Sequence, residues 1–326
     1  MDWERLWEAK EPGAAALRAA LWPASLLYAA GWEAYAATYR LGLKRAREPH
    51  RPVVCVGNLR VGGSGKTPAT RAVARALTAI GRDVAVSCSG YGSPASESAS
   101  LAPEGYLDAA VWGDEPAEMR ILEPSLPLVV GRDRVRAAEI VHERFPGHVM
   151  LMDDGFQHLR LKVHLSLLLD SDGGNALCLP AGPYREPRRH RSRASEVLPG
   201  RFRVEYGPMG FYDQEGRPAY PVRVAVLTAI ARPERLLASL SDASVEVAAV
   251  TTLPDHDPLA AGNLFEGLPA DVPIAVTLKD WVKLRERPDL EERQVITAVR
   301  SAEIEPRASF AEFLRTSLDG LEQTQD

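Results

Sequence analysis

The sequence predicts an α/β fold with a mostly parallel sheet that carries a phosphate-binding loop, a second and smaller α/β domain, and an N-terminal amphipathic helical segment. Three observations lead to this prediction. Short apolar runs alternate with helical patterns, which is typical of βαβ units around a parallel sheet. A glycine-rich turn follows the first apolar run, and a Pro/Gly/Arg-rich region at 179–203 separates two alternating sets of elements.

Length and composition narrow the class of protein. The 326 residues provide one large or two moderate domains, and the net charge of −5 argues against a general nucleic-acid-binding protein. We expect no cleavable signal peptide and no transmembrane helix, because the acidic opening lacks an apolar segment and no run of about 18 apolar residues occurs. Cys55, Cys88 and Cys178 have no metal-ligand spacing and are expected in the core.

The N-terminal segment, residues 1–48, combines aromatic and basic residues. Residues 14–39 are rich in Ala, Leu, Trp and Tyr, and Pro23 should begin or kink a helix there. A helix lying on an anionic membrane surface fits this composition, and a helical hairpin packed on the protein's own core fits it equally well. The basic cluster that follows consists of Arg40, Lys44, Arg45, Arg47 and Arg51.

A predicted P-loop opens the first domain, residues 49–215. Strand Val53–Val56 leads into a glycine-rich turn and then a helix through Ile80. In such a loop, backbone N–H groups hold nucleotide phosphates, a lysine reaches the β/γ-phosphates, and a Ser/Thr hydroxyl can bind Mg²⁺. Because Arg60 replaces the usual first glycine, a plain strand-to-helix turn is the alternative. The residues assigned to nucleotide phosphates are Gly62, Gly63, Ser64, Gly65, Lys66 and Thr67.

The remaining elements follow from the same periodicities. In the first domain we expect strands at Val84–Ser87, Leu128–Val130, Val149–Met152 and Leu165–Asp170, helices at Glu115–Leu122 and Arg134–Arg144, and a loop at 92–107. A turn-rich stretch at 205–222 suggests the boundary to a domain at 216–326. There we expect strands near Val222–Leu227, Val245–Val250, Ile274–Thr277 and Val295–Val299, and a closing helix around Phe310–Leu318.

Several acidic motifs are candidates for chemistry. Asp153 and Asp154 directly follow a strand, and with a P-loop upstream two such carboxylates suit Mg²⁺ together with Thr67. Asp114 begins a helix, where it is either an N-cap or the acceptor of a proton from an attacking hydroxyl. His256, flanked by two aspartates, is either exposed or held in one tautomer to orient another acid.

The sequence LPAGPYREP and the arginines that follow it form a dense basic loop. Arg185 and Arg188 are the candidates here for an anionic substrate, because arginine forks match phosphate oxygens bidentately. The alternative is a solvated run of charges, particularly for the later arginines.

Taken in order, the motifs GNLRVGGSGKTP, GDEP, DDGFQH, LPAGPYREP and PDH resemble the tetraacyldisaccharide 4′-kinase family over nearly the whole chain. The resemblance implies a P-loop kinase domain, a smaller α/β domain and an active site between them. It implies transfer of the γ-phosphate of ATP, with Mg²⁺, to the 4′-hydroxyl of an acylated glucosamine disaccharide 1-phosphate, forming lipid IVA. It also implies attachment through the N-terminal helix to the cytoplasmic face of the bacterial inner membrane.

Site roles carried over from the family fall on matching positions. Lys66 and Thr67 would serve the phosphates and Mg²⁺, Asp153 and Asp154 would lie next to the metal, and Asp114 would be the general base paired with His256. The catalytic set is therefore Lys66, Asp114, Asp154 and His256.

The chain departs from the family in three places, one of which is the loop Asp255-His256-Asp257, where the family usually has Asp-His-His or similar. Ser89 and Leu278 stand where the family usually has Arg and Glu. A P-loop kinase for another membrane-borne lipid or sugar, and a degenerate nucleotide-binding homologue without catalysis, remain the alternatives.

Overall fold

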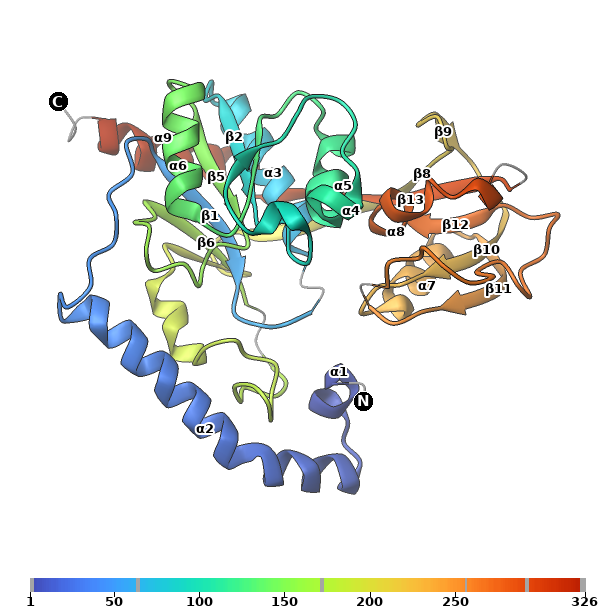
Figure 1. Cartoon of the computed structure of the whole chain (residues 1–326), viewed down its shortest axis with the longest axis horizontal. Helices are drawn as coiled ribbons and strands as arrows, with labels where there is room; N and C mark the ends of the chain where they lie inside the picture. Colours follow the sequence, from blue (N-terminus) through green and yellow to red (C-terminus); the bar gives the residue numbers. More distant parts are fainter. Residues whose placement is uncertain (1–2, 63–64, 171–172, 256, 291–292, 323–326) are drawn as a thin grey trace.

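A computed structural model describes residues 3–62, 65–170, 173–255, 257–290 and 293–322, which form two sheets with helices packed around them (Figure 1). The first sheet has the strand order β3-β4-β2-β5-β1-β6-β7, and every pair is parallel except β3–β4. This confirms the predicted α/β class. Its strands are β1 (Val53–Asn58), β2 (Val84–Cys88), β3 (Ser100–Leu101), β4 (Leu128–Val130), β5 (Val149–Asp153), β6 (Leu165–Leu169) and β7 (Glu196–Leu198).

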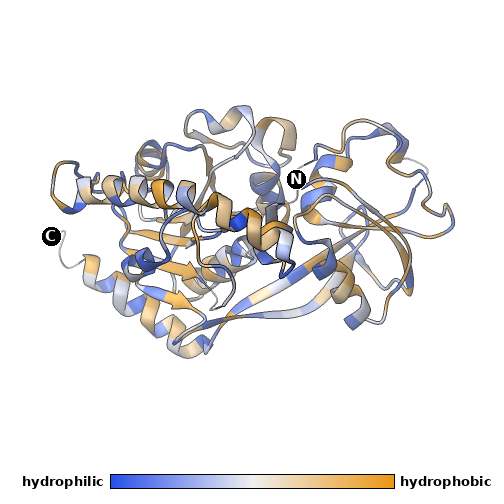
Figure 2. Ribbon diagram, turned by 90° about the horizontal axis from the view of Figure 1, so that it is seen from below, coloured by the Kyte–Doolittle hydropathy of each residue, from blue (hydrophilic) through white to orange (hydrophobic). Residues whose placement is uncertain are grey.

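Helices cover both faces of this sheet, so its central strands are almost continuously apolar. Figure 2 shows that hydrophobic residues dominate these strands. Val73 and Leu77 pack on one face, in a cluster with Val54, and Val141 packs on the other face with Met150. The helices around the sheet are α3 (Lys66–Ala79), α4 (Ala109–Trp112), α5 (Asp114–Leu122) and α6 (Arg134–Arg144), with 3₁₀ turns at Pro94–Ser96 and Arg188–Arg193.

Strand β1 lies between β5 and β6, and all three run in the same direction. Their carboxyl ends therefore meet at one edge of the sheet, where ligands bind in open α/β folds. The loop after β1 is the predicted P-loop, and β5 ends at Asp153. This topology brings the P-loop and the aspartate pair together.

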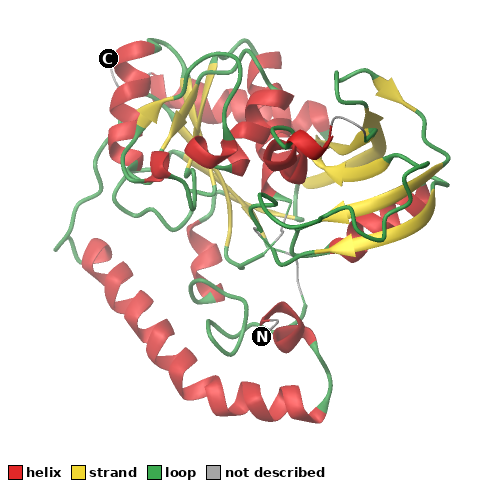
Figure 3. Cartoon of the chain, turned by 45° about the vertical axis from the view of Figure 1, so that its right-hand side comes forward, coloured by secondary structure: helices red, strands yellow, loops and turns green. Residues whose placement is uncertain are grey.

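The second sheet has the order β11-β10-β12-β13-β8-β9, with β8 and β9 antiparallel to their neighbours (Figure 3). Its strands are β8 (Arg203–Tyr212), β9 (Pro218–Ala219), β10 (Arg223–Thr228), β11 (Glu246–Thr252), β12 (Ile274–Thr277) and β13 (Val295–Glu305). Helices α7 (Pro233–Asp242) and α8 (Leu278–Leu284) accompany it, with a 3₁₀ turn at Pro288–Leu290.

The turn-rich stretch near 205–222 contains a strand that sequence reasoning missed. Residues Gly207 and Pro208 lie in β8, opposite a register shift between Arg300 and Ala302 of β13. An irregularity of this kind tolerates a proline, which cannot donate a ladder hydrogen bond. A Cβ at Gly207 would lie 2.4 Å from the Ser301 hydroxyl, so a larger residue there would displace that side chain. The expected loop at 92–107 likewise contains the short strand β3.

The C-terminal helix forms as predicted but packs elsewhere. Helix α9 (Arg307–Glu322) was expected to close the second set of elements, yet its buried Phe310, Leu314 and Leu318 belong to the core cluster of the first sheet. Elements α3 and α9 are in direct contact, as are α3 and β13. The long strand β13 therefore takes part in the second sheet and carries the chain back to the first.

The N-terminal segment forms two helices, α1 (Trp3–Glu8) and α2 (Pro12–Arg40). Pro23 lies inside α2 without ending it, and Figure 1 shows the helix bending along its length. Among the described residues, no helix is sufficiently long and apolar to cross a membrane. The exposed large apolar side chains of α2 are Leu17, Trp22, Leu26, Leu27 and Tyr28.

The three cysteines are free and buried, as expected of core residues.

Candidate active site

The loop between β1 and α3 contains two glycines with positive φ. Gly62 and Gly65 have φ values of 98° and 76°, which L side chains rarely adopt, and Lys66 begins α3 directly after Gly65. A Cβ at Gly65 would also lie 2.1 Å from the Tyr206 hydroxyl of β8. Of the residues assigned to this loop, Gly63 and Ser64 lie outside the described part of the chain.

Gly57, the glycine upstream of the loop, has a packing role. A Cβ at this position would lie 2.6 Å from the Cβ of Phe156. Phe156 belongs to the turn after β5, so Gly57 allows that turn to approach β1 closely. Arg60, at the position of the usual first glycine, forms a backbone bridge with Tyr184. The loop is thereby attached to the LPAGPYREP segment.

Asp154 is the point at which the P-loop, the turn after β5 and that segment converge. Its φ of 53° lies in the left-handed region, which Asp tolerates better than most residues. Its carboxylate lies 3.6 Å from Lys66 Nζ and accepts both arms of the Arg185 guanidinium, at 2.8 and 3.0 Å. Two of the predicted site residues, Lys66 and Arg185, therefore both contact a third, Asp154.

Asp153 is more deeply buried and is held from two sides. The Thr70 hydroxyl of α3 donates to its Oδ1 at 2.8 Å. The buried Arg134 donates to its backbone oxygen at 2.8 Å and to the Ser87 hydroxyl at 2.7 Å, which ties the ends of β5 and β2 together. Thr67, predicted to bind metal, is half-buried in the first turn of α3.

The two aspartates have pKa values shifted in opposite directions. Burial, followed by the charge of Glu115, raises the pKa of Asp153 to about 7, although the Thr70 hydroxyl opposes this. Burial also acts to raise the pKa of Asp154, but Lys66 and Arg185 outweigh it and hold the value below its usual range. The surroundings therefore favour the charged form of Asp154 more strongly than that of Asp153.

Asp114 lies at the first position of α5, nearly buried, where lysines of the second sheet's helix reach it. Lys279 and Lys283 of α8 place Nζ at 3.6 and 3.7 Å from its Oδ2. Close backbone packing brings it there, because a Cβ at Gly113 would lie only 3.2 Å from Gly90 Cα, just after β2. The carboxylates around Lys279 raise its pKa despite the opposing effect of burial, and Asp114 is the strongest of them.

His256, the predicted partner of Asp114, lies outside the described residues. Its neighbour Asp255 lies 4.0 Å from Lys279 Nζ. The same lysine therefore contacts Asp114 and the residue before His256.

A cavity of about 260 Å³ adjoins the P-loop on the side of β6. Arg188, the other predicted substrate residue, does not join Arg185 but donates to Asp170 at 3.0 Å, at the end of β6. The cavity lining draws on both sheets and includes Asn58, Gly62, Asp170, Tyr206, Arg232 and Arg235.

Sequence reasoning missed several residues of the site. Lys279 stands in a recognised stretch, TLKD, in which Asp280 accepts from Thr228 at 2.7 Å and so attaches α8 to β10. The sequence therefore contained a motif that could have drawn attention to Lys279. Nothing in the local pattern around Thr70 or Arg134 indicated their contacts with Asp153, since the partners are 83 and 19 positions away.

A P-loop of this form, followed by paired aspartates at the end of the adjacent parallel strand, defines an α/β nucleotide-binding protein. The sequence model of the family described as tetraacyldisaccharide-1-P 4′-kinase (LpxK) matches residues 17–319. The chain belongs to this family.

Relatives and a solved structure agree with this assignment. The chain is 33% identical to the tetraacyldisaccharide 4′-kinase of Shewanella woodyi, covering 86% of both chains. It is 36% identical to that of Geobacter metallireducens, covering 72% of this chain and 77% of the relative. The fold matches the ATP complex of LpxK from Aquifex aeolicus with a TM-score of 0.80 at 23% identity, over 93% of this chain and 99% of the other.

Proposed function

We propose that this protein is an ATP-dependent kinase that transfers the γ-phosphate to the 4′-hydroxyl of a tetraacyldisaccharide 1-phosphate. Family membership supports this substrate class. The observation that carries the chemistry is the meeting of Lys66, Arg185 and Asp154 at the carboxyl edge of the first sheet. Phosphoryl transfer depends mainly on positioning and on neutralising phosphate charge, and two cations at a P-loop serve both needs.

We assign the nucleoside part of ATP to the cavity beside the P-loop. It adjoins Gly62 and is lined by Tyr206 and by Arg232 and Arg235 of the second domain. An aromatic ring and arginines are suitable neighbours for a base and its phosphates. We assign the predicted phosphate contacts to Gly62, Gly63, Ser64, Gly65, Lys66 and Thr67.

Asp153, Asp154 and the Thr67 hydroxyl would hold Mg²⁺, which would neutralise phosphate charge when bound. The donors fit this ion, because Mg²⁺ prefers oxygen ligands and is bound by one or two carboxylates together with substrate phosphates. The closeness of several carboxylates to one another also supports a bound cation here. Glu115 and Asp154 both help to raise the pKa of Asp153, and a cation would relieve this repulsion.

Asp114 is the candidate base for the 4′-hydroxyl. It faces the second domain through Lys279 and Lys283, and Asp255 approaches the same Lys279. We assign His256 to orienting Asp114 and Arg188 to binding anionic substrate, together with Arg185.

The exposed apolar residues of α2 and the basic cluster after it would attach the protein peripherally to the cytoplasmic face of the bacterial inner membrane. The lipid substrate resides in such a surface, so attachment there would bring enzyme and substrate together.

The test is an assay with radiolabelled ATP, Mg²⁺ and tetraacyldisaccharide 1-phosphate in detergent. The unaltered protein should form the 4′-phosphorylated product. Lys66→Ala should abolish transfer, because the γ-phosphate loses a point charge within the loop. Thermal unfolding of the variant should match that of the unaltered protein, since Lys66 contacts Asp154 at the site rather than the core. Unchanged turnover by Lys66→Ala would refute the P-loop assignment.

A further inference from the structure

Helix α2 has an inner face that contacts the segment carrying Arg185. The buried Ser25 hydroxyl oxygen accepts from the backbone N–H of Ala181 at 2.8 Å. The Tyr28 hydroxyl donates to the backbone oxygen of Arg185 at 2.8 Å. We call residues 181–193 the arginine arm. These two contacts hold its N-terminal part.

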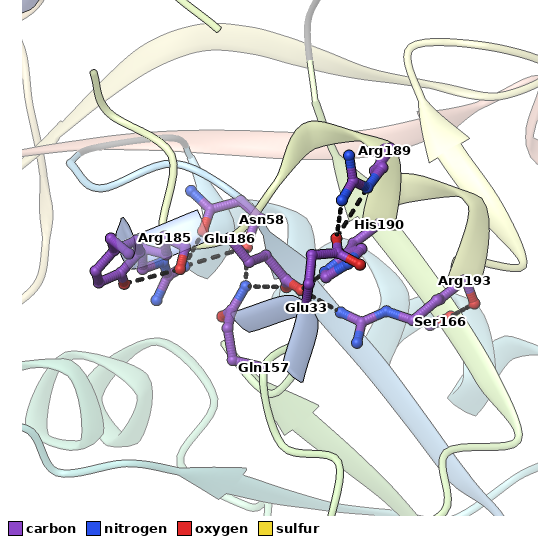
Figure 4. A network of polar contacts seen from close by, with 10 residues as sticks. Glu33, Asn58, Gln157, Ser166, Arg185, Glu186, Arg189, His190 and Arg193 are labelled. Carbon is purple, nitrogen blue, oxygen red and sulfur yellow. Dashed lines mark hydrogen bonds and ion pairs between the residues drawn. The ribbon is translucent and has the colours of Figure 1, made fainter. Parts of the chain in front are cut away.

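Glu33, further along α2, holds the other end of the arginine arm. Its Oε1 lies 2.6 Å from His190 Nε2, and His190 Nδ1 lies 2.8 Å from Oε2 of Glu186 (Figure 4). Gln157 Nε2 then donates to Glu186 Oε1 and to the backbone oxygen of Asn58, both at 2.9 Å. A continuous polar network thus runs from α2 to the strand that leads into the P-loop.

Burial makes this network sensitive to the loss of a member. Glu186 is fully buried, and a buried carboxylate is tolerated only when it is paired and hydrogen-bonded. Arg193 supplies one partner, at 2.6 Å from Oε2, and His190 another. Because ionised carboxylates only accept, the imidazole bridges Glu33 and Glu186 when both of its nitrogens carry hydrogen. Removing Glu33 takes away the carboxylate that contacts Nε2 of the His190 imidazole.

One residue within the arginine arm, Arg185, lies at the proposed active site. Arg185 precedes Glu186 in the chain and grips Asp154 with both arms of its guanidinium. The backbone oxygen of Arg185 accepts the hydrogen bond from the Tyr28 hydroxyl. The backbone of Arg185 is therefore hydrogen-bonded directly to α2. A shift of α2 is therefore a shift of Arg185.

We propose that α2 is a positioning element for the active site, acting on Arg185 through Tyr28 and through the Glu33–His190–Glu186 bridge. His190 is then a positioning residue rather than a catalytic one. The same helix also exposes Trp22, Leu26 and Leu27, so a surface that takes up these side chains also fixes the arginine arm. This coupling rests on the proposed kinase function, whose active site it adjusts.

The test compares matched variants of the full chain bound to anionic phospholipid vesicles that contain the disaccharide substrate. Tyr28→Phe removes the hydroxyl that reaches Arg185, whereas its control Tyr35→Phe removes one that bonds to Tyr39 within α2. Glu33→Ala breaks the bridge to His190, whereas its control Arg189→Ala removes only an exposed partner of the same carboxylate.

Tyr28→Phe and Glu33→Ala should each lower kcat by about tenfold, because small misplacements of catalytic groups cost up to about 10²-fold. Vesicle binding should be unchanged, since Tyr28→Phe keeps the aromatic ring and both variants keep Trp22, Leu26 and Leu27. The double variant should lose less than the product of the single losses, because both act on one arm. The two controls should retain the kcat of the unaltered protein.

Hydrogen exchange of the vesicle-bound protein gives a reading independent of turnover. Amides of the arginine arm, including those of Arg185 and His190, should exchange faster in Tyr28→Phe and Glu33→Ala than in the controls. Equal exchange in variants and controls, or equal kcat values, would overturn the coupling. If the unaltered protein lacks turnover, the proposed function fails, and the exchange rates still decide whether α2 positions the arm.

Discussion

At the scale of single residues, the site brings opposite charges together and places side by side two acids whose pKa values are shifted in opposite directions. Asp154 is paired with Lys66 and Arg185, whereas Asp153 is buried against Thr70 and its pKa is raised to about 7. A phosphoanhydride entering here would offer the two cations a new partner. The same arrangement recurs at Asp114, whose partners Lys279 and Lys283 come from the other sheet.

Asp114→Ala should lower kcat by at least about tenfold, a floor beneath the range of about 10²–10⁴ that a positioned base contributes. The affinity for ATP should change little, because Asp114 is not assigned to the phosphates. Asp108→Ala, which alters an exposed aspartate one helix earlier, is the control. In combination with His256→Ala the loss should be less than additive if the two act as a unit. Unchanged kcat in Asp114→Ala would exclude it as the base.

Glu118 gives a prediction on pH. Burial raises its pKa from an ordinary 4.5 to about 7, although the charge of Lys279 opposes the shift. As the pH rises from about 4.5 to 7, the unfolded chain releases this proton while the folded protein retains it, so stability falls.

Glu118→Gln should therefore raise the melting temperature most above pH 7, with the gain shrinking towards pH 4.5. Each unit of pKa shift corresponds to about 1.4 kcal/mol of unfolding free energy at most. Calorimetry at pH 4.5 and 8, with the exposed Glu97→Gln as control, checks this. A gain that does not depend on pH would contradict it.

At the scale of elements, helix α9 connects the end of the chain to the first sheet. Phe310 and Phe313 contact Phe202 with ring centroids at 5.1 and 5.3 Å, and Leu314 and Leu318 are buried in the same cluster as α3. Because α3 begins at Lys66, the helix that presents the P-loop lysine rests on the last helix of the chain.

Phe310→Ala should lower the free energy of unfolding by about 3–5 kcal/mol, the cost of removing a buried aromatic side chain without refilling its space. Urea denaturation measures this, and Glu312→Ala, exposed on the same helix, should change it little. A cost below about 1 kcal/mol would show that α9 is dispensable to the first sheet.

At the scale of the whole molecule, the two sheets are joined through the site as well as through the chain. Besides the lysines on Asp114, Arg285 of α8 donates to the backbone oxygen of Leu107 at 2.7 Å. Glu8 of α1 also contacts both parts of the molecule. It lies 3.3 Å from Arg60, in the loop after β1 of the first sheet, and 3.1 Å from Arg232, just before α7 beside the second sheet. The N-terminal helices thus contact the same region as the cavity beside the P-loop.

Replacing Leu26 and Leu27 of α2 together by serine should weaken binding to anionic vesicles, because apolar surface available to the membrane is lost. Raising the salt concentration should weaken binding of the unaltered protein through the basic cluster. Sedimentation with vesicles measures both effects. Serine at Tyr220 and Val222, which are more exposed but belong to the second sheet's side, is the control and should bind normally. Equal losses in both double variants would rule out α2 as the membrane-binding surface.

Patterns local to the sequence were sufficient for the strands and helices that frame the site. Strand β1 follows from an apolar run, the glycine turn from residues that permit φ > 0, and α3 from helical spacing. The pair Asp153–Asp154 follows from its place at the end of β5. These elements depend on neighbours within about ten positions along the chain, so local composition and hydrophobic periodicity predict them. The resemblance of five ordered motifs supplied the family.

Only the tertiary structure decided which distant groups meet. The Lys279–Asp114 pair, the grip of Arg185 on Asp154 and the return of α9 to α3 join residues far apart in the chain. The strand through Gly207 and Pro208 also required its partner, since the register shift opposite β13 accommodates a proline that local rules read as a turn. The physical reason is the same throughout. Side-chain pairing and strand register are fixed by packing between elements, and no periodicity along the chain encodes that packing.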